Sequence, residues 1–253
     1  MKGTKIHFKG REYNTDGDRP LRLNDVPKVD SDKKLKNIFK DKSLVVFKIT
    51  DKELLGVNKL KFKRKRFLML EPNPVTFYFS LSFDAVYQLE DARKIFESIL
   101  DDDPDSKTVI FSYIFKVSSV GIIFSSFALE AFMNQMLPDY AQFKYKGKLV
   151  DKNHIQRWAT FDDKIKNIIP QLCNKDFGLK YPKKMDTILK LKKIRDELTH
   201  LKEQRKNGFT SYDDIYQDIL DLNLKSIVVA VKGFINFYHP GLIYNYKGKT
   251  SIK

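Results

Sequence analysis

The spacing of apolar and polar residues changes about one third of the way along the chain. Before that point, residues 59–67 begin with an apolar–polar alternation and residues 75–83 maintain one throughout. A period of two is typical of half-exposed strands. Residues 44–49 form a short β-branched run between polar residues, which also predicts a strand. Residues 1–35 are polar and rich in turn formers, so we expect an irregular arm there with room for one short strand.

From residue 84 onward, apolar residues recur at spacings of three and four, which is typical of helices with one buried face. This spacing predicts helices at residues 85–100, 108–137, 161–172, 183–201 and 212–238. Between them we expect a loop or short hairpin at residues 142–151 and a polar loop at residues 202–211.

The segment at residues 108–137 is the most apolar part of the chain, and we interpret it as a central core or interface helix. Its longest uncharged run has 13 residues, whereas a membrane-spanning helix needs about 20, so we expect no membrane span. One line of polar residues interrupts the apolar surface: Ser119, Ser126, Glu130 and Asn134. A carboxylate in the middle of such a helix is costly unless it is paired, so we expect an arginine partner for Glu130.

These patterns predict a mainly α fold in two parts, a small basic β-rich subdomain at residues 1–82 and a helical bundle at residues 83–253. The single cysteine, Cys173, excludes an intrachain disulfide and a cysteine-cluster zinc site. The first 15 residues lack the apolar stretch of a signal peptide, so we expect a cytoplasmic protein. The chain has no glycine-rich phosphate loop and no metal-binding motif, so no cofactor and no metal is expected.

Positive charge is concentrated in the first third of the chain. The net charge is +15, of which residues 1–82 carry +10, from 20 Lys and Arg against 10 Asp and Glu. The densest patch places six basic residues within eight positions: Lys59, Lys61, Lys63, Arg64, Lys65 and Arg66. With Phe62 and Phe67 interleaved, this patch is a candidate RNA-binding surface. Lysines also protect solvated strand edges from aggregation, and that alternative remains open.

Three other features have simpler interpretations. Four aspartates surround Pro104 within residues 101–105, and we expect Asp105 or Ser106 to cap a helix there rather than to bind a metal. Surface or capping roles are expected for His7, His154 and His239. We expect Trp158 to lie in the core.

The segment 183–201 contains the candidate chemistry, Arg195 and His200. At 100° per residue, Arg195 lies at the edge of the apolar face and His200 about 140° further round, on the polar side. A histidine can exchange a proton with a ribose 2′-hydroxyl or a leaving oxygen near neutral pH. An arginine can stabilise the charge that develops on the phosphate. The pair could therefore cleave RNA without a metal, although the same residues also occur as solvated surface side chains.

Two segments together resemble the HEPN superfamily of helical domains. Residues 127–134 resemble the family's first conserved helix, with a glutamate between aliphatic residues, and Glu130 occupies that position. Residues 195–200 resemble its Arg-polar-x3-His signature, in which Asp196 is the polar residue. The resemblance spans roughly residues 84–238. The β-rich first third lies outside it.

The resemblance implies a homodimer in which the signature helices of two copies meet across a two-fold axis. It implies a metal-independent endoribonuclease, often a toxin or phage-defence effector that cleaves tRNA or other RNA and is controlled by an antitoxin or regulatory partner. By position, Arg195 would hold the scissile phosphate, His200 would act as general base or acid, and Asp196 would orient one of them. Glu130 would anchor Arg195. Some members carry a modifiable tyrosine where this chain has Lys202, so that form of control is not implied.

Two alternatives remain beside this hypothesis. A non-catalytic HEPN-like module would bind RNA or a nucleotide, with the basic patch providing the affinity and a steep dependence on salt. A structural or partner-binding helical protein would show no affinity for RNA at low salt.

Overall fold

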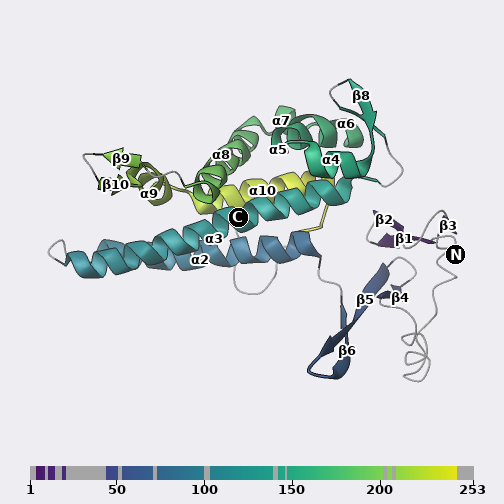
Figure 1. Ribbon diagram of the computed structural model, residues 1–253, viewed down its shortest axis with the longest axis horizontal. Coiled ribbons are helices and arrows are strands. Elements are labelled where there is room, and N and C mark those ends of the chain that lie inside the picture. The colour runs from purple at the N-terminus through teal and green to yellow at the C-terminus, as the bar shows by residue number, and fades with distance from the viewer. Residues whose placement is uncertain are drawn as a thin grey trace. The chain divides into compact units, whose positions relative to one another are not determined.

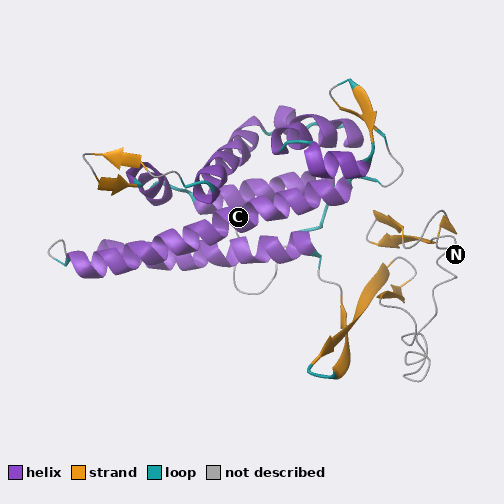
Figure 2. Ribbon diagram, in the orientation of Figure 1, coloured by secondary structure: helices purple, strands orange, loops and turns teal. Residues whose placement is uncertain are grey.

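The computed structural model describes residues 4–8, 11–14, 19–20, 44–50, 53–70, 73–99, 103–138, 142–145, 147–201, 204–206 and 209–243. The chain divides into two compact units, Met1–Pro72 and Asn73–Lys253. Helices predominate among the described residues, and the few strands lie mostly in the first unit (Figure 2). The prediction of a mainly α chain is therefore confirmed.

The first unit contains two small sheets. The first sheet has the order β2-β1-β3, formed by β1 (Thr4–Phe8), β2 (Arg11–Asn14) and β3 (Arg19–Pro20). The second has the order β4-β5-β6 and is antiparallel throughout, formed by β4 (Leu44–Thr50), β5 (Glu53–Phe62) and β6 (Lys65–Leu70). The strand predicted at residues 44–49 is confirmed. The arm at residues 1–35 contains three short strands rather than one.

The basic patch forms the end of a hairpin, so the prediction of one strand over residues 59–67 is wrong. Strand β5 ends at Phe62 and β6 begins at Lys65, with Phe62 and Lys65 paired across the turn. The two turn residues, Lys63 and Arg64, have positive φ angles of 45° and 67°. Two residues with positive φ are typical of a type I′ hairpin, which usually has Asn and Gly at these positions. Because neither residue is present here, the turn could not be recognised from the residue types.

The second unit begins with α2 (Pro74–Ser98), so the strand predicted at residues 75–83 is wrong. Its buried residues recur at helical spacing and include Val75, Phe79, Ser82, Val86 and Leu89. Asn73 caps the helix, because its side chain accepts a hydrogen bond from the Val75 N–H, and Pro74 occupies the first turn. Residues 73–82, which we assigned to the β-rich part, therefore belong to the helical unit.

Helix α3 (Pro104–Met136) packs along α2 in an antiparallel pair (Figure 1). Its N-cap is Asp103, which accepts a hydrogen bond from the Ser106 N–H, so the capping role of the aspartate run is confirmed but the predicted capping residue is wrong. The helix is tightly covered at Gly121, where an added Cβ would lie 2.5 Å from Cδ2 of Leu224. The absence of a side chain at Gly121 thus permits the start of α10 to approach.

By length and composition α3 is the one helix of the described residues that could cross a membrane, although its longest uncharged run suggested otherwise. One third of its most apolar 18-residue window is buried inside the protein. The core helix of a soluble protein has the same length and composition, so this feature alone is weak evidence for a membrane span.

A series of short elements follows α3. The hairpin expected at residues 142–151 is present as β7 (Phe143–Tyr145) and β8 (Lys148–Val150). The chain continues through α4 (Lys152–Trp158), which the spacing did not predict, and α5 (Phe161–Asp163). The π-helix η2 (Lys164–Ile168), α6 (Ile169–Cys173), α7 (Phe177–Lys180) and α8 (Pro182–Thr199) complete this region.

The helical segment predicted at residues 161–172 is present, but its middle forms a wider π-helical turn. Pro170 follows this turn, and a proline ring would clash with the carbonyl of residue 166 in a regular α-helix. The widened turn removes that conflict. Trp158 ends α4 with 63% of its surface exposed, so its predicted place in the core is wrong.

The last part of the chain differs from the prediction in two places. Within the segment predicted as a loop, the strands β9 (Gln204–Lys206) and β10 (Phe209–Ser211) pair in an antiparallel arrangement. The single helix predicted at residues 212–238 is two helices, α9 (Asp213–Leu220) and α10 (Leu224–Tyr238). Arg93 of α2 explains the break, because its Nη2 donates to the carbonyls of Ile219, Leu220 and Leu222 at 3.2, 2.8 and 2.8 Å.

One hydrophobic core joins the long helices. Helix α10 packs against α2, α3 and α8, and α3 also packs against α8 (Figure 1). The largest fully buried side chains at this junction are aromatic, and Phe234 of α10 contacts Phe132 and Phe177 with tilted or edge-on rings. This packing holds α8 beside α3 and so fixes the position of the candidate site.

Candidate functional site

Glu130 of α3 and Arg195 of α8 form an ion pair although 65 positions separate them in the sequence. Arg195 Nη2 donates to Glu130 Oε1 at 2.5 Å. The arginine side chain is 21% exposed and the glutamate side chain 37% exposed, so the pair is partly shielded from water. The arginine partner that we expected for Glu130 is therefore present, and it is Arg195.

Asp196 holds the other terminal nitrogen of the same guanidinium. Its Oδ1 lies 3.0 Å from Arg195 Nη1, and its Oδ2 lies 3.1 Å from Lys192 Nζ. The Nε atom of Arg195 is buried and has no hydrogen-bond partner among the described residues. Two carboxylates thus fix the plane of the guanidinium, and Asp196 orients Arg195 rather than His200.

A second cation, Lys164, contacts the same polar line of α3. Its ammonium group donates to Asn134 Oδ1 at 3.0 Å and to the Gln156 carbonyl at 3.2 Å. The residue is only 7% exposed, and burial lowers the pKa of Lys164 while the nearby Glu130 carboxylate opposes that shift. The polar line of α3 therefore contacts two cationic side chains from other elements, Arg195 and Lys164. Sequence reasoning identified Glu130 and Asn134 but missed Lys164, because nothing in its neighbourhood marks it as buried.

The serines of that polar line have a different role. Ser119 Oγ donates back to the Phe115 carbonyl of its own helix at 2.8 Å. Ser126 is buried, and its hydroxyl has no hydrogen-bond partner among the described residues. The half of the line that contacts cationic side chains is thus the second, Glu130 and Asn134.

His200 is exposed at the C-terminal end of α8. It is the C-cap residue, and its backbone N–H donates to the Asp196 carbonyl at 3.0 Å. Within the described part of the chain, no hydrogen bond or ion pair joins its imidazole to Arg195 or to any other side chain. A single copy of the chain therefore presents the two candidate catalytic groups separately, with the imidazole accessible to solvent.

Charges around Arg195 are nearly balanced. Asp162 lies 3.2 Å from Lys166 and 3.9 Å from Lys192, measured between the carboxylate oxygens and the ammonium nitrogens. Lys193 and Glu197, four residues apart on α8, lie 3.6 Å apart. A phosphate approaching this surface would meet carboxylates as well as cationic side chains, so the surface lacks the uniform positive charge of a general polyanion-binding patch.

The basic patch is a separate feature of the first unit. Among its six residues, Lys61, Lys63, Arg64 and Lys65 are exposed around the hairpin turn. Lys61 pairs with Arg66 and Lys59 with Leu68 in the strand ladder. Phe62 is also exposed, and Lys63 Nζ lies 5.4 Å from the centre of its ring. The hairpin therefore offers cations next to an accessible aromatic ring, as a nucleic-acid contact requires.

Family models, curated proteins and solved structures were compared with this chain, and none matches it. Among the described residues, no group of three or more His, Cys, Asp or Glu side chains could hold a metal ion. Cys173 is a free, partly buried thiol, and burial raises its pKa.

Proposed function

We propose that this protein is a HEPN-type, metal-independent endoribonuclease that acts as a homodimer in the cytoplasm. In this proposal it is a toxin or phage-defence effector that cleaves tRNA or other RNA. The observation that carries the proposal is the ion pair between Glu130 and Arg195. It supports the resemblance because it joins the two helices that carry the family-like segments and leaves His200 exposed at the end of the helix that carries Arg195.

The chemistry needs one base, one acid and a charge stabiliser. An imidazole of His200 would take the proton of a ribose 2′-hydroxyl, and the 2′-oxygen would attack the adjacent phosphorus. The bond to the 5′-oxygen of the next nucleotide would break, and that oxygen would receive a proton from a protonated imidazole. The products are a 2′,3′-cyclic phosphate and a 5′-hydroxyl. Arg195 would stabilise the negative charge on the phosphate oxygens.

A second copy of the chain is needed to assemble these groups. Five positions along an ideal helix correspond to about 7.5 Å along the axis and about 140° around it. His200 follows Arg195 by five positions and is the C-cap of α8. A two-fold axis beside α8 would bring the polar faces of two such helices together and would place two imidazoles and two guanidinium groups in one cleft. In this arrangement Glu130 and Asp196 keep each Arg195 at a fixed angle, and an antitoxin or regulatory partner would act by covering the cleft.

The proposal is tested by incubating the purified protein with RNA in excess EDTA and analysing the product ends. We expect cyclic phosphate ends from the wild type and none from His200→Ala or Arg195→Lys. His200 is exposed, so its replacement should leave the melting temperature within about 2 °C of the wild type. The control variant Lys94→Ala removes an exposed cation from α2 and should cleave normally. Cleavage by His200→Ala at the wild-type rate would refute the proposal.

The charge balance around Arg195 favours a second candidate, a non-catalytic HEPN-like module that binds RNA or a nucleotide. Both terminal nitrogens of the guanidinium already contact carboxylates, as in a purely structural ion pair. The hairpin of the first unit would then provide the affinity for RNA. This candidate predicts RNA binding without product formation, a steep loss of affinity with salt, and loss of binding when Lys61, Lys63 and Lys65 are replaced by glutamate.

A further inference from the structure

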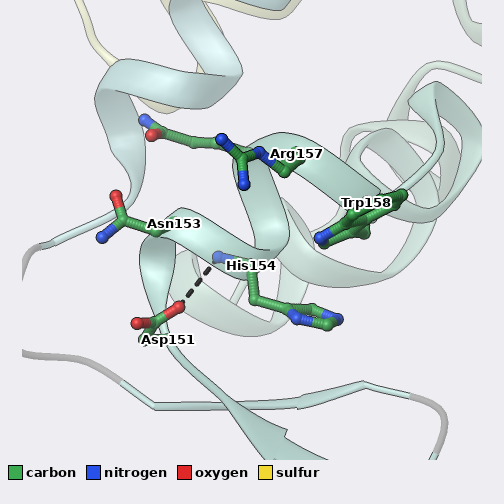
Figure 3. Close-up of a pocket in the computed structure, with 6 residues that line it drawn as sticks. Asp151, Asn153, His154, Arg157 and Trp158 are labelled. Atoms are coloured by element: carbon green, nitrogen blue, oxygen red, sulfur yellow. Dashed lines mark hydrogen bonds between the residues drawn. The ribbon is translucent and has the colours of Figure 1, made fainter.

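The surface of α4 carries a pocket that the proposed chemistry does not use. Its volume is about 690 Å³, within the range of small-molecule sites. The pocket is lined by Asp151, Asn153, His154, Gln156, Arg157 and Trp158. Figure 3 shows the rings of His154 and Trp158 on the same side of the helix, as expected for residues four positions apart.

Trp158 is the single tryptophan of the chain, and its exposure is unusual. An indole can bury a large apolar area, and tryptophan residues are highly buried on average. Here 63% of the residue surface is open to solvent, although the core lies directly behind α4 at Ile155, which is fully buried. An accessible indole is a stacking surface for a flat ring, and every nucleobase has such a face.

The groups beside the indole suit the rest of a nucleotide. Arg157 is exposed and makes no ion pair with any described residue, so its guanidinium is available to a phosphate. Asn153 is exposed and offers both amide donors and an acceptor. The carboxylate of Asp151 is engaged at the helix cap, because Oδ1 accepts the His154 N–H at 2.8 Å (Figure 3). Residues 142–163 contain five Lys and Arg against three Asp. One of these carboxylates, Asp163, is held by the hydroxyl of Tyr145 at 3.0 Å.

Contacts connect this pocket to the Arg195 site. Gln156 lies between them, because its side-chain amide donates to the Asn134 carbonyl at 3.3 Å and its own carbonyl accepts from Lys164. Asn134 lies one helical turn beyond Glu130, which binds Arg195. The base of the α4 pocket and the candidate catalytic arginine are thus held by the same stretch of α3.

We propose that the α4 pocket binds one nucleotide of a single-stranded RNA, with the base stacked on Trp158 and a phosphate on Arg157. This inference rests on the proposed function for the identity of the ligand, and it names where the RNA docks outside the cleavage site. A rival ligand is an anionic membrane, because Leu149 of the adjacent hairpin is 71% exposed, follows Lys148 and pairs with Lys144 in the strand ladder. The hydrogen-bonding groups of Asn153 and His154 favour a nucleotide, since a lipid surface would leave them without a specific partner.

The single tryptophan makes the inference directly measurable. The full-length protein would be titrated at low salt with a 2′-O-methyl oligonucleotide, which has no free 2′-hydroxyl and therefore cannot be cleaved by the proposed mechanism. Because Trp158 is the one indole in the chain, we expect saturable quenching of tryptophan fluorescence and reduced quenching by acrylamide in the complex. An unchanged emission spectrum at saturating oligonucleotide would overturn the inference.

Variants separate stacking from charge. By anisotropy of a labelled oligonucleotide, we expect Trp158→Ala to weaken binding about tenfold, Arg157→Gln to weaken it severalfold, and Trp158→Phe to retain most of the affinity. Leu149→Ser is the matched control, because it removes an exposed apolar side chain of the same region and should not alter RNA affinity. Equal affinities for wild type and Trp158→Ala would refute the inference, as would binding to anionic phosphatidylglycerol vesicles in the absence of any RNA binding.

The two proposals fail in different ways. Quenching of Trp158 fluorescence by RNA, in a protein that never cleaves RNA, would support nucleotide binding at the α4 pocket and refute the nuclease proposal. Cleavage that depends on His200, with no change in Trp158 fluorescence and no effect of Trp158→Ala on KM, would support the nuclease and remove the α4 pocket.

Discussion

The ion pair between Glu130 and Arg195 leads to a quantitative prediction that does not depend on catalysis. Replacing Glu130 by glutamine keeps the shape of the side chain and an acceptor oxygen but removes the charge. A fully buried pair broken on one side costs about 3–5 kcal/mol, and an exposed pair contributes less than about 1 kcal/mol. With the two side chains 21% and 37% exposed, the pair lies between these limits. We therefore expect Glu130→Gln to lower the free energy of unfolding by about 1–2 kcal/mol.

The pairwise energy can be isolated with a double-mutant cycle of Glu130→Gln and Arg195→Met. Urea unfolding followed by circular dichroism at 222 nm reports the unit Asn73–Lys253, because the described helices lie in that unit. Urea is preferable to guanidinium chloride, whose ions would screen the interaction. We expect a coupling energy of about 1 kcal/mol. In the Glu130→Gln variant, Asp196 still binds Arg195, whereas Lys164 loses its favourable interaction with the Glu130 carboxylate.

A matched cycle on Lys94 and Asp91 provides the control. Their charged atoms lie 3.2 Å apart, but the side chains are 74% and 75% exposed, so their coupling should remain below about 0.5 kcal/mol. If the Glu130–Arg195 coupling were no larger than this, Glu130 would not hold the guanidinium in solution. The link between the two family-like segments would then lose its support.

Three further predictions concern stability. Leu129 is fully buried in α3, so Leu129→Ala should lower the free energy of unfolding by about 2–5 kcal/mol in urea, whereas a similar truncation of the exposed Leu179 should cost less than about 0.5 kcal/mol. Lys63 and Arg64 both have positive φ, so replacing them with Asn and Gly should stabilise the hairpin by about 1 kcal/mol, measured as slower amide exchange in β5 and β6. Burial raises the pKa of Tyr238 from 10.0 to about 12, so its folded state binds a proton that the unfolded state releases in this interval. The free energy of unfolding of the wild type should therefore fall between pH 10 and 12 more steeply than that of Tyr238→Phe, which has no phenolic proton. Parallel pH profiles for the two proteins would contradict the raised pKa of Tyr238.

The helical part of the fold was predictable where one apolar face dominates the spacing. Buried Met185, Ile188, Leu191 and Ile194 show that α8 has the face predicted for it. The apolar surroundings also identified Glu130 as a carboxylate that needs a cationic partner, because an unpaired charge within so apolar a helix is costly. The choice of Arg195 as the partner required the family resemblance, since spacing alone cannot bring α3 beside α8.

The stretch at residues 75–83 was misassigned because its aromatic residues satisfy two periods at once. Phe77 lies on the alternating pattern, yet it is exposed on α2, while Val75, Phe79 and Ser82 are buried at helical spacing. A stronger signal was present just before it, because Asn followed by Pro is a frequent start of a helix. Local capping chemistry would have decided the case correctly.

Other features could not be predicted because tertiary contacts create them. The break between α9 and α10 depends on Arg93, which lies more than 120 positions earlier and donates to the carbonyls that end α9. The burial of Lys164 depends on Asn134 and on the carbonyl of Gln156, and a lysine in a polar sequence gives no sign of either contact. Such long-range interactions override local preference.

The way α2 begins has a consequence for how the gene can vary. Asn73 accepts hydrogen bonds from the Val75 N–H at 3.0 Å and from the Gln135 side chain of α3 at 3.4 Å, and Thr76 donates to its carbonyl at 3.0 Å. Among the described residues, the groups in these bonds (Asn73, Val75, Thr76 and Gln135) all belong to the same unit. A recombination event just upstream of Asn73 would leave those bonds intact, so the helices can be inherited as a module joined to a different leading segment.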